Sequence, residues 1–277
     1  MSELLDRLTS RLCVETGLVT AFSSGADSAL LAAAAHLILG ARVLAVTAVS
    51  ASLPTRERTD ARQFAPIRQL PHIEVCTDDL DRPDYVRNGR DRCFHCKSAL
   101  MDALAPVAAR NGCPCRTWRQ SGRPGGPPAW SACRGRTRHR IPLVDAGLTK
   151  ADVRALSREL GLPTAAKPAA ACLSSRVAYG DPVTAQMLAW IEQAEKLLKD
   201  RGIAQSRVRA HAGGTVARVE VPAGEFAGLL DCRDELVRAF RQAGFTLVTL
   251  DLAGLRSGSM NLLLDGSRGH TMPGDGP

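Results

Sequence analysis

The chain is 277 residues long and 45% hydrophobic, and its 36 Lys and Arg against 28 Asp and Glu give a net charge of +8. This balance is typical of a globular protein with one large or two modest domains, and it excludes disordered and collagen-like chains. No segment approaches the roughly 20 apolar residues of a membrane-spanning helix, and the N-terminal segment MSELLDRLTS has no apolar core. We therefore expect a cytoplasmic protein without a membrane span or secretory signal.

Strands and helices alternate in the first part of the chain. Short apolar or β-branched runs predict strands, and longer segments rich in helix-forming residues predict helices. The strands are expected over 17–22, 42–49 and 72–76, and the helices over 29–39, 55–69 and 98–110. Because such alternation builds βαβ units around a parallel sheet, an α/β domain is predicted for residues 1–165.

A second, smaller α/β domain is predicted for residues 166–277. The helix before it ends near residue 160 and starts at a capping box, in which Thr149 and Asp152 satisfy each other's backbone N–H groups. A loop of small residues follows over 167–180. Beyond it, helices are expected over 184–200 and 225–242, and strands over 207–211, 216–221 and 246–250.

The segment SSGADS, between the first predicted strand and helix, has the composition of an anion-binding loop. Ser23, Ser24, Gly25 and Ser28 offer hydroxyl and backbone donors at a helix N-terminus, where the helix dipole favours a phosphate. Asp27 is a candidate ligand for a Mg²⁺ ion on that phosphate. The Walker pattern G-x-x-x-x-G-K-[ST] is absent, which argues against a kinase-like phosphate loop. An ordinary serine-rich helix cap is the structural alternative.

Cys172 is the candidate nucleophile. It lies among small residues, with Lys167, Arg176 and several hydroxyl groups near it in sequence, and cationic neighbours favour the thiolate form of a cysteine. For a cysteine taken alone, a small buried apolar residue is the usual alternative.

Two segments resemble those of known enzymes. The loop SSGADS is similar to the S-G-G-x-D-S signature of the PP-loop ATP pyrophosphatases, with Ser24 in place of a glycine. The segment KPAAACLSSRVAYG is similar to the active-cysteine segment of the ATP-dependent sacrificial sulfur transferases of the LarE family. Further blocks that match this family lie at residues 44–50, 91–97, 142–162, 207–221 and 249–261.

The resemblance implies both a fold and a reaction. The fold is a Rossmann-like PP-loop ATP pyrophosphatase domain, of the adenine nucleotide alpha hydrolase type, followed by a sulfur-transfer and substrate-binding domain, in a homo-oligomer. ATP with Mg²⁺ is expected to adenylylate a carboxylate of a pyridinium mononucleotide, to which Cys172 then gives its sulfur. This is a step in the synthesis of the nickel-pincer cofactor of lactate racemase. The ATP-binding residues implied are Ser23, Ser24, Gly25, Asp27, Ser28 and Ser50.

A basic strand in the second domain is the candidate substrate site. Arg207, Arg209 and His211 alternate along the predicted strand and therefore share one face. Because paired guanidinium groups suit a phosphate, Arg207 and Arg209, with Arg176, are expected to bind the phosphate and carboxylates of the substrate. A solvated strand face is the alternative. Glu220 is a candidate for a metal or substrate contact, or equally for a surface acid.

Cys93 and Cys96 form a Cys-x-x-Cys pair in a segment, 91–97, that is expected to be a loop. The spacing suits a zinc site, an iron–sulfur site or a redox pair, but it supplies only two metal ligands. The resemblance adds a further option, an iron–sulfur cluster that involves Cys93, Cys96 and Cys172.

Residues 114–140 are unlike their surroundings. They hold seven arginines, no acidic residue, and both Trp118 and Trp130 among crowded Gly and Pro, so most of the net charge lies there. The LarE family has a block of the type G-[TA]-N-x-D-D-x-x-D-x-R-P-G in this place, whose acids and amide line the nucleotide site. We hypothesise that a local shift of reading frame replaced this block, and the nucleotide sequence of the gene tests this hypothesis.

Two other functions are compatible with the sequence. A tRNA-thiolating enzyme built on the same ATP domain would use the positive charge, although that charge is confined to the arginine-rich segment, so nucleic acid is not the expected partner. A nucleotide-binding relative without activity would be consistent with Ser24 and with the missing acidic block. Salt-sensitive binding of tRNA would identify the first, and binding of ATP without release of pyrophosphate would identify the second.

Overall fold

The computed structural model divides into two compact units. The first unit consists of Met1–Asp79 and Cys93–Ala171, and the second of Leu80–Arg92 and Cys172–Pro277. The residues that the structure describes are 3–113, 115–116, 142–168, 171–203, 205–256 and 258–261.

The boundary between the units differs from the one expected from sequence. The sequence placed it between residues 165 and 166, whereas the contacts of the structure place it between Ala171 and Cys172. The excursion of residues 80–92 into the second unit was not predicted. It depends on long-range bonds, since the side-chain amide of Asn88 donates to the carbonyl oxygens of Ala178 (2.7 Å) and Asp181 (2.9 Å).

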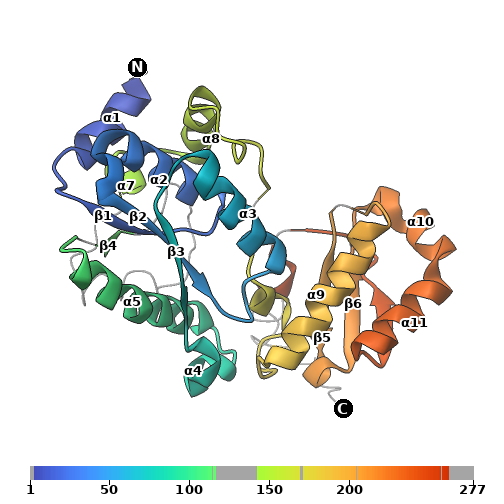
Figure 1. Cartoon of the computed structure of the whole chain (residues 1–277). Helices are drawn as coiled ribbons and strands as arrows, with labels where there is room; N and C mark the ends of the chain where they lie inside the picture. The colour runs from blue at the N-terminus through green and yellow to red at the C-terminus, as the bar shows by residue number, and fades with distance from the viewer. Residues whose placement is uncertain are drawn as a thin grey trace, which may run out of the picture. The chain divides into compact units, whose positions relative to one another are not determined.

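The first unit is built on a four-stranded sheet in the order β3-β2-β1-β4 (Figure 1). All of its strand pairs are parallel, which confirms the predicted parallel α/β architecture. Strand β1 is buried at every position, as expected for a strand covered on both faces. The strands are β1 (Leu18–Ala21), β2 (Val43–Val49), β3 (His72–Cys76) and β4 (Cys115–Arg116).

Helices cover both faces of this sheet (Figure 1). On one face, Leu18, Val43 and Ala45 join a core that also contains side chains of five helices. On the other face, Val19 and Val46 pack against one long helix, α5 (Arg92–Arg110). The two sets alternate along the strands because successive side chains of a strand point to opposite faces. The five helices are α1 (Glu3–Leu12), α2 (Ala26–Leu39), α3 (Thr55–Ile67), α7 (Pro142–Asp145) and α8 (Lys150–Glu159).

Two helix starts show where local reasoning succeeded and where it was wrong. The capping box of α8 is confirmed, since the Thr149 hydroxyl accepts from Asp152 N (3.3 Å) and the Asp152 carboxylate accepts from Thr149 N (2.8 Å). The expected loop over 91–97 is wrong, because α5 begins at Arg92 and carries this segment as its first turns. Packing of the following apolar residues on the sheet overrides the weak helix propensity of cysteine, histidine and phenylalanine.

The second unit has a three-stranded sheet in the order β5-β6-β7. Strands β5 (Arg207–His211) and β6 (Val216–Glu220) are antiparallel, and β7 (Leu247–Leu250) lies parallel to β6. Helices α9 (Ala185–Asp200) and α11 (Arg233–Ala243) pack against the sheet and against each other. The single helix expected over 225–242 is in fact two helices, since α10 (Phe226–Asp231) ends before Cys232 and α11 begins after it. The segment 80–92 adds one short helix to this unit, α4 (Pro83–Val86).

The sheet of the second unit has one apolar and one polar face. Val208 and Ala210 of β5 and Ala217 and Val219 of β6 alternate with the charged residues and are buried. The register pairs Arg209 with Arg218 and Arg207 with Glu220, so these four side chains share the polar face. In the part of the chain that the structure describes, no helix combines the length and apolar composition that crossing a bilayer requires.

Candidate functional site

The serine-rich loop lies where parallel sheets bind ligands. It follows β1, so it stands at the carboxyl edge of the sheet, where the loops after β2 and β3 also emerge. The chain passes from β1 to β2 on one side, whereas β4 pairs with β1 on the other side. In open α/β sheets, ligands bind in the crevice outside the carboxyl ends of the strands at such a switch point.

The loop itself is closed by hydrogen bonds between its serines. The Ser28 hydroxyl donates to Gly25 O (3.1 Å) and accepts from Ser23 N (3.2 Å), and the hydroxyls of Ser23 and Ser28 lie 3.2 Å apart. Gly25 is the N-cap of α2, so the first N–H groups of this helix have no intrahelical partner. Ser23 and Gly25 are partly exposed, whereas Ser28 is buried. The loop thus presents backbone donors and one hydroxyl to an anion.

Ser24 stands where the PP-loop signature has a glycine, and its side chain is committed to contacts inside the first unit. Its φ of 51° lies in the left-handed region, and its side chain is fully buried. The hydroxyl donates to Glu57 O (3.1 Å) at the start of α3 and accepts from Lys167 Nζ (3.1 Å). The side chain therefore ties the loop to the body of the unit.

Replacement of Ser24 separates these bonds from the backbone conformation. Ser24→Ala loses both bonds but keeps the unfavourable φ, so we expect the free energy of unfolding to fall by about 1–3 kcal/mol. Ser24→Gly loses the same bonds but relieves the left-handed conformation, which is worth about 1 kcal/mol. The glycine variant should therefore be the more stable of the two in urea unfolding. A glycine variant less stable than the alanine variant would contradict this account of the loop.

Two lysines contact the loop, and sequence reasoning assigned neither of them to it. Lys150 Nζ donates to Asp27 Oδ1 (2.7 Å), and Lys167 Nζ contacts Glu57 (2.9 Å) and Asp60 (2.7 Å) as well as Ser24. Lys167 was expected to act on Cys172, but its charge is balanced by acids of α3. These contacts join residues more than 100 positions apart, so no local pattern could have shown them.

Ser50 lies at the same edge of the sheet, directly after β2. Its hydroxyl donates to Asp79 Oδ2 (3.1 Å) and accepts from Ser52 N (3.1 Å). Asp79 is buried and also accepts from the Thr77 hydroxyl (3.2 Å). These bonds hold the loops after β2 and β3 in place beside the serine-rich loop.

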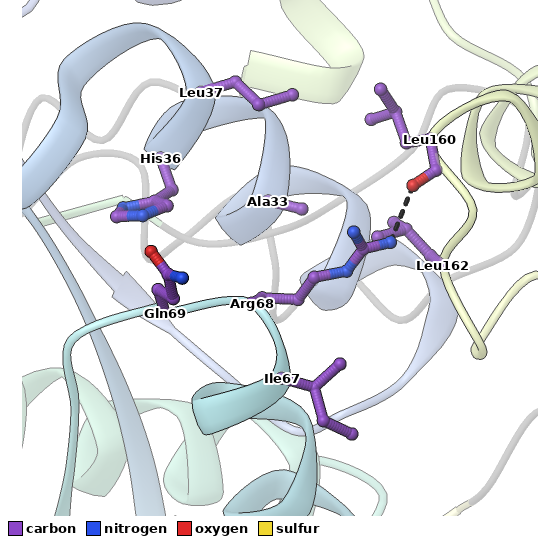
Figure 2. A pocket seen from close by; sticks show the side chains of 8 residues that line it. All are labelled: Ala33, His36, Leu37, Ile67, Arg68, Gln69, Leu160 and Leu162. Atoms are coloured by element: carbon purple, nitrogen blue, oxygen red, sulfur yellow. Dashed lines mark hydrogen bonds between the residues drawn. The ribbon is translucent and has the colours of Figure 1, made fainter.

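A hollow of about 250 Å³ in the first unit is not part of this site. Figure 2 shows its lining, with the Arg68 guanidinium directed at the Leu160 carbonyl oxygen (2.6 Å). The hollow lies at the C-terminal ends of α2 and α3, around His36 and Ile67. Because α2 starts at the carboxyl edge of the sheet and runs back across it, this hollow is at the opposite edge.

In the second unit, Cys172 lies in a turn that two arginines hold. It is the N-cap of a short 3-10 helix, Leu173–Arg176, and its thiol is partly exposed. Its carbonyl oxygen accepts from Arg176 Nη1 (2.9 Å) and from the Ser175 hydroxyl (2.7 Å). Arg209 Nη1 donates to Ser175 O (3.1 Å). The sulfur lies 3.0 Å from the Ser174 hydroxyl oxygen, in polar surroundings, which is unlike an inert core cysteine.

Both arginines are themselves fixed by buried carboxylates. Arg176 Nε pairs with Glu195 (3.0 Å), and both side chains are about 5% exposed. Arg209 donates twice to Glu220 Oε2 (3.2 and 3.1 Å), while Glu220 Oε1 accepts from Ser259 (2.7 Å). Glu220 is fully buried, so the alternative of a surface acid is wrong. The roles predicted for Arg176 and Arg209 in substrate binding stay predictions, and the geometry shows that both anchor the cysteine turn.

Arg207 has a different environment from these two arginines. In the described part of the chain no carboxylate lies within ion-pair distance of its guanidinium, which donates to Ser206 O (2.8 Å). Burial and the charge of neighbouring Arg176 lower the pKa of Arg207. Burial and the charge of Arg218 likewise lower the pKa of His211, whose Nε2 is buried without a hydrogen-bond partner. This face therefore offers the Arg207 cation to a bound molecule.

Comparison with known proteins identifies the family. No family model matches the chain. The chain is 37% identical over 256 residues to an uncharacterized protein of Synechocystis sp., a match that covers 88% of this chain and 91% of that protein. It is 32% identical over 248 residues to the pyridinium-3,5-bisthiocarboxylic acid mononucleotide synthase of Lactiplantibacillus plantarum, covering 87% of each chain. The chain belongs to the LarE family. The resemblance found from sequence motifs is thereby confirmed.

Two features of this LarE-family chain stay outside the site as described. Cys93 and Cys96 occupy the first turns of α5, and the described residues contain no group of three or more His, Cys, Asp or Glu side chains that could share a metal ion. The zinc, redox and iron–sulfur roles of this pair therefore stay predictions. The arginine-rich segment falls almost wholly outside the described residues, so the frameshift hypothesis also stays a prediction.

Proposed function

We propose that this LarE-family chain is an ATP-dependent sulfur transferase that moves the sulfur of Cys172 to an adenylylated carboxylate of a pyridinium mononucleotide. The observation that carries the proposal is the setting of Cys172, a partly exposed thiol in a turn fixed by two buried ion pairs. The activity for which the L. plantarum relative is named, synthesis of a pyridinium bisthiocarboxylic acid mononucleotide, supports the class of product.

The first half of the reaction belongs to the first unit, which we propose to be a PP-loop ATP pyrophosphatase domain. A free carboxylate resists attack by a thiolate, because its charge repels the nucleophile and oxide is a poor leaving group. The serine-rich loop would hold the phosphates of ATP through its helix N-terminus and the Ser23 hydroxyl. The substrate carboxylate then attacks the α-phosphate, and pyrophosphate leaves.

A Mg²⁺ ion on the phosphates would be held by Asp27 together with phosphate oxygens. The Asp27 carboxylate is paired with Lys150, so this ion pair has to open or to share the carboxylate. Lys150, whose only ion-pair partner among the described residues is this carboxylate, would then be placed to balance the negative charge of a triphosphate. In the bound state, the metal supplies charge neutralisation at the leaving pyrophosphate.

The second half belongs to Cys172. Its thiolate attacks the carbonyl carbon of the acyl adenylate, and AMP leaves with the electron pair of the broken C–O bond, so a thioester forms. A base then removes the Cα proton of residue 172, and the Cβ–S bond breaks with its electron pair on sulfur. The products are a thiocarboxylate and a dehydroalanine at position 172. One turnover per chain follows unless sulfur is resupplied.

Arg207 is the side chain that we propose to bind the substrate's phosphate. For Arg207→Met we expect the dissociation constant of the mononucleotide to rise at least about tenfold, because a hydrogen bond to a charged group is lost. Removal of a partly buried cation without a carboxylate partner should not lower the free energy of unfolding. Titration calorimetry and urea unfolding measure the two effects. Arg233→Met, at an exposed arginine paired with Asp234, is the control, and unchanged affinity in Arg207→Met would contradict the assignment.

The proposed function is tested on the full chain with ATP, Mg²⁺ and pyridinium dicarboxylate mononucleotide. We expect release of pyrophosphate, formation of a thiocarboxylate and a mass loss of about 34 Da confined to Cys172. Product formed with an unchanged Cys172 would exclude sacrifice of this sulfur. Binding of ATP without release of pyrophosphate would show a nucleotide-binding protein without this activity.

A further inference from the structure

We propose that Ser174 is a positioning residue for the nucleophile, donating a hydrogen bond from its hydroxyl to the ionised sulfur of Cys172. The inference takes its purpose from the proposed sulfur transfer, but the contact and its test depend on neither ATP nor substrate. The two atoms lie 3.0 Å apart in the free protein. Nothing in the sequence singled out Ser174 from the other hydroxyl residues of the segment.

The direction of this bond follows from the chemistry of the two groups. A thiol and a hydroxyl can each donate to the other, but an ionised sulfur has no proton and can only accept. Ser174 is 1% exposed, so water does not compete for its hydroxyl. Among the residues that the structure describes, the hydroxyl has no hydrogen-bond partner other than this sulfur. Its proton is therefore available to the thiolate, and bonds to a charged acceptor are the stronger ones.

The backbone around Ser174 keeps the two groups together. On one side, the Cys172 carbonyl oxygen is held by Arg176 and Ser175, and on the other side Ser175 O is held by Arg209. The two arginines that donate these bonds are themselves fixed by buried ion pairs with Glu195 and Glu220. The turn therefore has little freedom to reorganise when the sulfur ionises. A donor that is already in place stabilises a developing charge without a cost of reorientation.

Ser175 provides a matched control within the same turn. Its hydroxyl donates to the Cys172 carbonyl oxygen and accepts from Arg176 Nη1 (3.1 Å). Ser175→Ala therefore removes a hydroxyl next to Ser174, together with a bond that shapes the turn, but the described contacts give it no bond to the sulfur. An effect specific to the sulfur should appear in Ser174→Ala and not in Ser175→Ala.

The experiment measures the rate at which iodoacetamide alkylates Cys172 in the full chain at neutral pH, by mass spectrometry of the Cys172 peptide. For Ser174→Ala we expect the rate to fall roughly 3- to 10-fold. The variant lacks the donor that stabilises the charge on the attacking sulfur, but a less stabilised thiolate is the stronger nucleophile, so the two effects partly cancel. In Ser175→Ala, Arg176 Nη1 still donates to the Cys172 carbonyl oxygen, so the rate should stay within about 2-fold of the wild-type rate. Cys232, a half-buried thiol of the same unit, is the internal reference.

The direction of the change separates this role from a structural one. Opening of the turn exposes the thiol and raises the rate, so unfolding cannot imitate the expected fall. If Ser174→Ala raises the alkylation rates of both Cys172 and Cys232, the second unit has opened in this variant. The variants Ser174→Thr and Ser174→Gly are then measured in place of Ser174→Ala. The threonine variant keeps the hydroxyl and the wild-type rate, and the glycine variant reacts more slowly. An unchanged Cys172 rate in a folded variant without the hydroxyl, or an equal fall in Ser175→Ala, overturns the proposal.

Discussion

In Cys172→Ser, thiocarboxylate formation is expected to fall to the uncatalysed background while pyrophosphate release continues. The reason is that the thiol takes no part in the proposed adenylylation, whereas it is the nucleophile of the proposed transfer step. A serine hydroxyl in place of the thiol is not ionised at neutral pH and is a weak nucleophile without an adjacent base. The variant is thus expected to prime the carboxylate but to deliver no sulfur. Measurement of both products in one reaction shows the separation directly.

The control for this variant is Cys232→Ser. Cys232 also lies in the second unit and is similarly half-buried, but its thiol donates to the carbonyl oxygens of Gly228 and Leu229 in α10. Its replacement should leave both pyrophosphate and thiocarboxylate at wild-type amounts. Full product formation by Cys172→Ser would mean that another sulfur is used, and loss of both products would assign Cys172 to adenylylation instead.

In Glu220→Leu, the free energy of unfolding is expected to fall by about 3–5 kcal/mol, the cost of breaking a buried ion pair from one side. Glu220 is fully buried, and protein groups satisfy both of its carboxylate oxygens. One oxygen accepts from Arg209, and the other accepts from Arg218 and Ser259. Arg218 keeps a second acid, Asp251 at 3.3 Å. Arg209 keeps none among the described residues, and its side chain is only 9% exposed, so it becomes the uncompensated charge.

Urea unfolding measures this loss, and two further variants interpret it. Asp200→Asn breaks an exposed pair with Lys196 and should cost less than about 0.5 kcal/mol. The double variant Arg209→Met, Glu220→Leu removes both buried charges and should recover part of the loss, as expected when two groups interact directly. Equal stability of Glu220→Leu and the wild type would show that the pair contributes nothing to holding the cysteine turn.

Local patterns were sufficient for most elements of the fold. The alternation of strands and helices predicted the parallel sheet, because side-chain periodicity reflects which face of an element is buried. The capping box at Thr149 was correct because it involves residues three positions apart. The predicted start of α5 was wrong because the first turns of this helix are stabilised by the packing of residues further along it and not by their own helix propensity.

For the candidate site too, the sequence predicted one part of the chemistry and the tertiary structure decided the other. By itself, the sequence determined which residue types could act, namely a serine-rich loop before a helix, a cysteine among hydroxyls and arginines that share a strand face. The family resemblance rests on those same segments. Only the tertiary structure decided which of these side chains are free and which are committed. Arg209 and Arg207 are two positions apart, yet the first is paired with Glu220 and the second has no such partner among the described residues.

The physical reason is that the partners of a polar or charged side chain decide whether it is available for binding, and these partners come from distant parts of the chain. Glu195 lies 19 positions from Arg176, Ser259 lies 50 positions from Arg209, and Lys167 lies 143 positions from Ser24. Burial makes each of these pairings strong, and burial is a property of the packed units. A pattern of residue types could therefore name the nucleophile, but the hydrogen bonds that hold its turn exist only in the folded chain.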